Sequence, residues 1–172
     1  MKKHQNITLI GMPGAGKSTI GIILAKVLAF GFVDTDILIQ LSRQKSLQQI
    51  LDEGDHLHLR KIEEEEILKI NVVNHVIATG GSAVYSEKAM SHLRSMSLLV
   101  FLQVGIEELS RRIHNFNSRG IAKAKHQSFL DLFNERQILY EKHADMIFDC
   151  NGLDQDRIAE KIADWYEGIV KI

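Results

Sequence analysis

A phosphate-binding motif near the start of the chain limits the fold more than any other feature. The segment Gly11-Met12-Pro13-Gly14-Ala15-Gly16-Lys17-Ser18 matches the pattern G-x-x-x-x-G-K-[ST]. It directly follows an apolar run, Ile7 to Ile10, and leads into a helical pattern over Ile20 to Leu28. In a strand–loop–helix of this kind, backbone N–H groups and the helix N-terminus face bound phosphates. The alternative is a glycine-rich turn that binds no phosphate. The complete motif between a strand and a helix argues against this alternative.

The rest of the chain alternates short apolar runs with helical patterns. Continuous apolar strands separated by helices predict a parallel sheet buried on both faces, which is a doubly wound, three-layer α/β fold. No internal repeat or linker divides the 172 residues, so we predict a single domain spanning residues 1–172. The five predicted strands are Ile7 to Ile10, Gly31 to Asp34, Val76 to Thr79, Leu98 to Leu102 and Met146 to Phe148.

Two segments extend this core. The stretch from Ile37 to Val73 is long enough for two or three helices, and Ser46 with Gln49 has the spacing of a capping box. The polar stretch from Asn115 to Gln127 lacks apolar periodicity, and a loop of this length is usually functional. We predict that the excursion, at about 37–73, binds the second substrate (the acceptor), and that the polar stretch, at about 115–127, forms a short lid.

Charge and cysteine content narrow the class of protein. Lys and Arg number 21 and Asp and Glu 22, a net charge of -1, so no global basic field favours nucleic acid or an anionic membrane. The single cysteine, Cys150, cannot form an internal disulfide, which favours a reducing cytoplasm. The apolar run from Ile7 to Ile10 is too short for a membrane span or a secretory signal.

A phosphate loop indicates a nucleotide but does not define the reaction. The chain has no Asn-Lys pair to read guanine, which disfavours a GTPase. Asp34 and Asp36 follow the second strand, where ligands of doubly wound sheets bind. Two carboxylates there suit Mg²⁺ and a substrate hydroxyl, although helix capping is an alternative role for an aspartate in this place.

Two arginines on helical patterns are candidates for binding an anionic acceptor. Arg136 lies within the apolar period of Phe129, Leu132, Phe133, Leu139 and Tyr140, and an inward guanidinium needs an anion. That anion is either a substrate carboxylate or a structural Asp or Glu. Arg60 shares a helical row with Glu63, which on its own can be a surface ion pair. Gly80-Gly81 after the third strand and Arg119 in the polar loop are weak signals separately.

Taken together and in this order, the motifs resemble those of shikimate kinases, a branch of the nucleoside-monophosphate-kinase-like P-loop proteins. The resemblance covers nearly the whole chain, and the string E-R-x-x-L-Y is fairly specific to that family. The matching segments are Gly11 to Thr19, Asp34-Thr35-Asp36, Leu59-Arg60-Lys61-Ile62-Glu63, Gly80-Gly81, Arg119 and Glu135 to Tyr140.

The resemblance implies transfer of the ATP γ-phosphoryl group to the 3-hydroxyl of shikimate, with Mg²⁺, in chorismate and aromatic amino acid biosynthesis. On the nucleotide side, Lys17 would hold the β- and γ-phosphates, Arg119 would close over the γ-phosphate and Arg112 would stack on adenine. Ser18 and Asp34 would organise Mg²⁺. The remaining nucleotide-binding positions are Gly14, Ala15, Gly16 and Thr19.

On the acceptor side, the resemblance makes Asp36 the residue that hydrogen-bonds the attacking hydroxyl and takes its proton. Arg60 and Arg136 would clamp the shikimate carboxylate, with Glu63 orienting Arg60. The backbone at Gly80-Gly81 would approach the substrate closely. The resemblance also implies a monomer that acts on a small molecule.

This chain departs from the family pattern at three points. Leu51 and Leu59 stand where the family often has aromatic residues near the substrate ring. Ser82 stands where the family usually has a third consecutive glycine, and Gly120 follows Arg119 where the family usually has proline. Two alternatives therefore stay open beside a shikimate kinase. One is a kinase of another carboxylated polyol such as a sugar acid, and the other is a nucleotide-sensing protein without catalysis.

Overall fold

The computed structural model, which describes residues 6–113 and 120–170, contains a five-stranded sheet with the order β2-β3-β1-β4-β5. Each neighbouring pair is parallel, as the continuous apolar strands predict. The strands are β1 (Asn6–Ile10), β2 (Gly31–Asp34), β3 (His75–Ala78), β4 (Ser97–Gln103) and β5 (Met146–Asp149). The predicted strands are confirmed, and no strand end is shifted by more than one residue.

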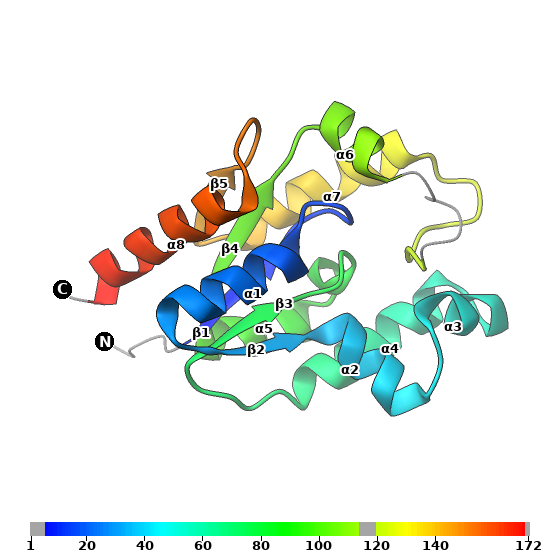
Figure 1. Cartoon of the computed structure of the whole chain (residues 1–172). Helices are drawn as coiled ribbons and strands as arrows, with labels where there is room; N and C mark the ends of the chain where they lie inside the picture. The colour runs from blue at the N-terminus through cyan, green and yellow to red at the C-terminus, as the bar shows by residue number, and fades with distance from the viewer. Residues whose placement is uncertain (1–5, 114–119, 171–172) are drawn as a thin grey trace.

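Helices cover both faces of the sheet (Figure 1). The helices α1 (Lys17–Leu28) and α8 (Gln155–Val170) contact each other on one face, and α5 (Glu87–Met96) and α7 (Phe129–His143) lie on the other. Residues from both layers bury fully against the strands, so the three-layer prediction is confirmed. None of the helices in the described ranges is long and apolar enough to cross a membrane.

The excursion between β2 and β3 forms three helices at one end of the sheet: α2 (Thr35–Arg43), α3 (Leu47–Glu53) and α4 (His56–Leu68). The predicted capping box is present, because Ser46 Oγ accepts from the Gln49 N–H and the Gln49 side chain accepts from the Ser46 N–H. A 3₁₀ turn, η1 (Ala83–Tyr85), follows β3, and α6 (Ile106–Arg112) follows β4.

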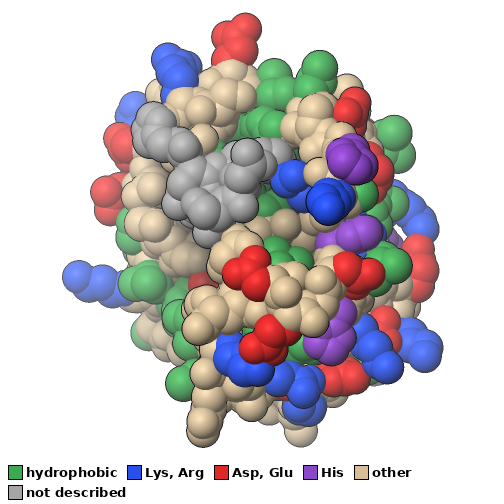
Figure 2. Space-filling view, turned by 90° about the vertical axis from the view of Figure 1, so that its right-hand side faces the viewer, with side chains coloured by type: hydrophobic (Ala, Val, Ile, Leu, Met, Phe, Trp, Pro, Cys, Tyr) green, Lys and Arg blue, Asp and Glu red, His purple; other side chains and the backbone are tan. Residues whose placement is uncertain are grey.

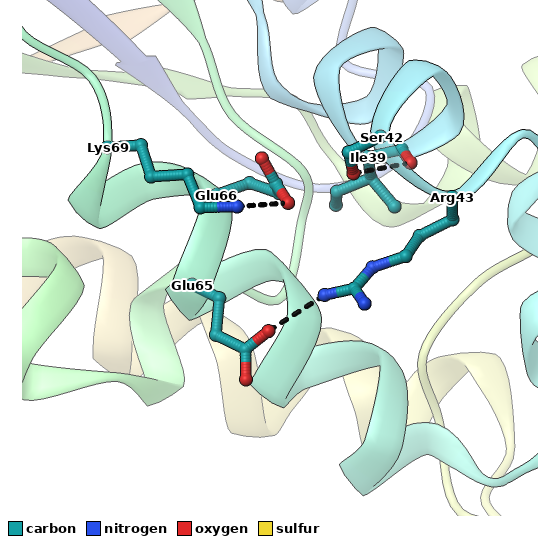
Figure 3. A network of polar contacts seen from close by, with 6 residues as sticks. All are labelled: Ile39, Ser42, Arg43, Glu65, Glu66 and Lys69. Carbon is teal, nitrogen blue, oxygen red and sulfur yellow. Dashed lines mark hydrogen bonds and ion pairs between the residues drawn. The ribbon is translucent and has the colours of Figure 1, made fainter.

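Two kinds of contact hold the excursion together. Arg43 at the end of α2 forms an ion pair with Glu65 of α4 at 2.8 Å, and Lys69 closes on Glu66 at 2.8 Å (Figure 3). Such partly exposed pairs contribute little, so apolar burial dominates. This burial is provided by a small second core, which includes one residue of the predicted lid, Ala122. Its members are Ile39, Ile50, Leu59, Ile62 and Ala122.

The side of the molecule that carries α3 and the end of segment 120–127 mixes charges of both signs. Acidic, basic and histidine side chains alternate on this face with no continuous basic surface (Figure 2). This agrees with the near-zero net charge of the chain.

Candidate active site

A cavity of about 340 Å³ lies at the carboxyl ends of the central strands, where the doubly wound fold places its ligands. The turn after β1, the turn after β3 and helices from the excursion all contribute to its walls. Sequence-predicted site residues that line it are Gly14, Gly16, Lys17, Ser18, Thr19, Asp36, Gly80, Gly81, Arg112 and Arg136. The sequence thus predicts most of one enclosed site.

The phosphate loop is closed on its own lysine. Lys17 Nζ donates to the carbonyls of Gly11 at 2.7 Å and Met12 at 2.9 Å. Burial lowers the pKa of this ammonium from 10.5 to about 8, against the opposing pull of Asp36. An incoming phosphate would compensate for the lost hydration, so the loop is suited to an anionic ligand.

A hydroxyl and a carboxylate meet beside the loop. Ser18 Oγ donates to Asp34 Oδ2 at 2.5 Å, while Asp34 Oδ1 caps α2 by accepting from the N–H groups of Asp36 at 2.9 Å and Ile37 at 3.4 Å. Asp34 therefore caps a helix and still presents an oxygen next to Ser18. Two protein oxygens beside a phosphate site are what Mg²⁺ usually takes, with substrate and water completing its shell. The donor set fits a nucleotide-bound magnesium ion.

The turn after β3 brings backbone against two carboxylates. A Cβ at position 80 would lie 2.2 Å from Glu63 Oε1 and 2.8 Å from Asp36 Oδ1, and one at position 81 would lie 2.7 Å from Arg136 Nη1. A Cβ at either position would displace these side-chain groups, so the bare glycine backbone allows the close approach. The Gly80 N–H itself donates to Thr35 Oγ1 at 2.9 Å.

Glu63 is the most perturbed acid of the site. It is 3% exposed, and burial together with the neighbouring Asp36 raises its pKa from 4.5 to about 7. Ser82 donates a hydrogen bond to Glu63 Oε2, whereas Oε1 has no hydrogen-bond partner. Arg136 and Lys17 oppose the rise. In the absence of ligands, this carboxyl group therefore exchanges its proton close to neutral pH.

A stability measurement can detect this proton. Between pH 4.5 and 7 the folded state holds a proton on Glu63 that the unfolded state releases, so stability falls as pH rises. We expect the free energy of unfolding to drop by on the order of 2 kcal/mol relative to Glu63→Gln across that range. Urea titrations at a series of pH values measure the difference. Glu65→Gln, on the exposed face of the same helix, is the control, and parallel profiles for wild type and Glu63→Gln would contradict the assignment.

Arg136 is buried as its periodicity predicts, with only 1% of its surface exposed. It lies on α7 on the same face as Leu132 and Tyr140, one turn before and one turn after it. Its Nη2 donates to the Ala122 carbonyl at 2.6 Å, and no carboxylate of the described residues pairs with it within 4.0 Å. No Asp or Glu of the described ranges therefore forms an ion pair with Arg136, and the guanidinium lines the cavity.

Tyr140 fixes the position of this arginine relative to the glycine turn. Its hydroxyl donates to the Gly81 carbonyl at 2.7 Å, and its ring stacks on Phe101 of β4 at 5.1 Å between centroids. Burial holds the pKa of Tyr140 well above its usual range, so it remains a hydrogen-bond donor. The E-R-x-x-L-Y string thus joins helix, strand and turn at the site.

Other predicted residues lie differently. Arg60 lines an adjoining cavity of about 370 Å³ that shares Ser82 with the first, and it contacts Tyr85 instead of Glu63. Arg112 donates to the Gly14 carbonyl at 3.4 Å beside the loop. Ala15, within the phosphate loop, is buried. Arg119 lies outside the described residues, so its closing role stays a prediction.

The sequence did not point to two residues near the site. Gln155, the first residue of α8, lines the cavity after β5. Its position just beyond a strand end is the signal that could have found it. Tyr85 lies in η1 beside Arg60 and Arg136. No periodicity marks a residue in such a short turn.

Comparison with known proteins identifies the family. The family model for shikimate kinase matches residues 13–167. A shikimate kinase of Thermodesulfovibrio yellowstonii is 33% identical over 166 residues, which cover 95% of both chains. The chain belongs to the shikimate kinase family. A second shikimate kinase, from Clostridium botulinum, is 35% identical over 159 residues, covering 91% of this chain and 93% of the other.

Solved shikimate kinases share this fold. The Acinetobacter baumannii shikimate kinase in complex with shikimate superimposes with a TM-score of 0.88 at 26% identity, covering 96% of this chain and 94% of that one. The Aquifex aeolicus shikimate kinase gives 0.80 at 29% identity, covering 95% and 97%. A Candida albicans thymidylate kinase, at 15% identity and a TM-score of 0.63, shares the fold alone. As a member of the shikimate kinase family, the chain is an ATP-dependent kinase that acts on a hydroxyl group with Mg²⁺.

Proposed function

We propose that this chain transfers the γ-phosphoryl group of ATP to the 3-hydroxyl of shikimate, giving shikimate 3-phosphate and ADP for aromatic amino acid biosynthesis. The observation that carries the proposal is Arg136, a buried guanidinium in the same cavity as the phosphate loop, with which no carboxylate of the described residues forms an ion pair. A planar fork in that place suits a carboxylated acceptor. Family membership supports shikimate as that acceptor.

The nucleotide side supplies charge and position. Lys17 leaves the carbonyls of Gly11 and Met12 for the β- and γ-phosphates, and Arg112 beside the loop covers the adenine. Ser18 and Asp34 would hold Mg²⁺, which would supply neutralisation of the phosphate charge. These groups act mainly by electrostatic stabilisation of the transferring phosphoryl group.

The acceptor side positions one hydroxyl for attack. Arg136 and Arg60 hold the carboxylate, and the Gly80-Gly81 backbone lets the ring approach. Asp36 lines the cavity and accepts the proton of the substrate 3-hydroxyl. At the same time, the oxygen of that hydroxyl forms its bond to the γ-phosphorus. The bond between that phosphorus and the β–γ bridging oxygen breaks, and ADP departs with the electron pair. Arg119, outside the described residues, is proposed to neutralise the charge on the transferring group.

The chain is proposed to work as one domain, residues 1–172, and as a monomer in the cytoplasm. Residues 37–73 bind the acceptor, and residues 115–127 form the lid. The small second core supports this division, because Ala122 packs with α2, α3 and α4 and so joins the end of the lid to the acceptor region. Acceptor binding and lid position are therefore mechanically connected.

Turnover of shikimate tests the proposal. ADP release with Mg-ATP should be saturable with shikimate and at least about 100-fold slower with gluconate-like acids. Asp36→Asn should reduce kcat by about 100- to 10,000-fold, because general base catalysis contributes on that order. Turnover of another acid alone would favour a sugar-acid kinase, and ATP binding without any turnover would favour a nucleotide sensor. Either result contradicts the proposal.

A further inference from the structure

Arg60 is held by an aromatic ring instead of a carboxylate. Its Cζ lies 3.5 Å from the centroid of the Tyr85 ring, a close cation–π contact. Its buried Nε has no hydrogen-bond partner, and the described residues offer it no ion pair. The expected Glu63–Arg60 contact is therefore not made.

Glu63 is engaged elsewhere because position 82 is a serine. The Ser82 hydroxyl donates to Glu63 Oε2, and glycine there would have no such group. The backbone at 82 has φ −96°, which both glycine and serine adopt, so serine fits here without backbone strain. The hydroxyl holds one oxygen of Glu63 on the Ser82 side, and no ion pair joins Glu63 to Arg60.

Tyr85 contacts the second arginine as well. Its ring centroid lies 5.4 Å from Arg136 Cζ, and its hydroxyl accepts from Arg136 Nε at 3.4 Å while donating to Glu135. Burial and the hydrogen bond to Glu135 raise the pKa of Tyr85, so it remains a neutral phenol able to donate. One side chain therefore touches both guanidinium groups that the proposed function assigns to the acceptor carboxylate.

Such contacts matter because the two arginines repel one another and Arg60 is long and flexible. Burial lowers the pKa of Arg60, and the charge of Arg136 adds to this effect. An unrestrained arginine loses side-chain entropy when it binds a ligand, and holding it in advance removes part of that cost. A ring on one face of the guanidinium leaves its N–H edge available for a carboxylate.

We propose that Tyr85 is a positioning residue for the acceptor site, which holds Arg60 and Arg136 in place for the carboxylate of the acceptor. In this role it replaces Glu63, whose carboxylate is hydrogen-bonded to Ser82. The inference rests on the proposed function, since the acceptor is the ligand affected. Tyr85 touches neither reacting atom. Its loss should act on acceptor affinity and leave the transfer step unchanged.

Steady-state kinetics of the full chain test the inference. We expect Tyr85→Leu to raise the KM for shikimate about tenfold, with kcat and the KM for ATP within about twofold of wild type. Tyr85→Phe keeps the ring and should raise that KM only about two- to threefold. Leu57→Ala, which shortens an exposed apolar side chain at the adjoining cavity of about 370 Å³, is the control. It should leave kcat and both KM values unchanged. Unchanged or lower shikimate KM in Tyr85→Leu would overturn the inference.

A double-mutant cycle tests the link to Ser82. Ser82→Gly releases Glu63, which lies three residues from Arg60 on α4 and can then pair with it. The effect of Tyr85→Leu should shrink from about tenfold to about threefold in the Ser82→Gly background. An equal effect of Tyr85→Leu in both backgrounds would refute the inference that Tyr85 takes over the positioning role of Glu63. If the wild-type chain does not phosphorylate shikimate, both proposals fail, whereas wild-type turnover with an unaffected Tyr85→Leu variant overturns this one alone.

Discussion

Replacing Lys17 by methionine should lower kcat by about 1,000-fold, equivalent to about 4 kcal/mol of transition-state stabilisation. Methionine is of similar length and fills the same buried space, so the loss is one of charge. Lys17 is 8% exposed and already desolvated, which strengthens its attraction to phosphate oxygens. The rate of ADP release under saturating Mg-ATP and shikimate measures the effect.

The pH dependence of ATP binding separates this role from a structural one. The pKa of Lys17 in the free protein is about 8, and bound phosphates favour the protonated form. ATP affinity of the wild type should therefore fall as pH rises through 8, because the free ammonium loses its proton. Lys17→Met should lack that fall while its shikimate affinity, measured calorimetrically, stays within about threefold.

Lys26→Met is the matched control, since Lys26 is exposed in the last turn of the same helix. It should behave as wild type in both measurements. Equal pH profiles for wild type and Lys17→Met would contradict the assignment of the titrating group. A large loss of shikimate affinity would instead indicate that Lys17 mainly supports the structure of the cavity.

The sheet could be predicted because burial on both faces leaves a direct mark in the sequence. Runs such as Leu98 to Leu102 are apolar without alternation, and only a strand covered by helices on both faces needs that composition. The phosphate loop could be predicted equally well, since phosphate binding requires specific residues at fixed spacing. Both signals are local, and neither depends on how distant segments pack.

The acceptor site depends on distant packing, and there the prediction was less complete. Periodicity placed Arg136 on the buried face of α7 but could not show whether a carboxylate faced it. The choice of partner for Glu63 was decided by Ser82, which lies beyond a strand and is distant in sequence. Tyr85 was missed because a 3₁₀ turn has no period to read, and its contacts come from α4 and α7.

Acceptor binding should depend on Arg136 more than on any other single side chain. Removing one partner of a buried, hydrogen-bonded charge pair costs about 2–5 kcal/mol, so Arg136→Met should raise the KM for shikimate at least about 30-fold. Arg136→Lys keeps the charge but loses the planar fork, and about a tenfold increase is expected. The KM for ATP should stay within about threefold in both variants. Arg43→Met, which removes an exposed arginine of α2, is the control.

The stability of the free enzyme distinguishes a binding arginine from a structural one. Arg136 is buried and has no carboxylate partner among the described residues, so methionine removes a costly charge. It also gives up the hydrogen bonds to the Ala122 carbonyl and the Tyr85 hydroxyl. These effects oppose one another, and the free energy of unfolding of Arg136→Met should lie within about 1 kcal/mol of wild type. Urea denaturation measures it. A loss of several kcal/mol, or equal weakening of shikimate and ATP binding, would mean that the guanidinium supports the fold, because a group kept for its ligand contributes most of its energy only when that ligand is bound.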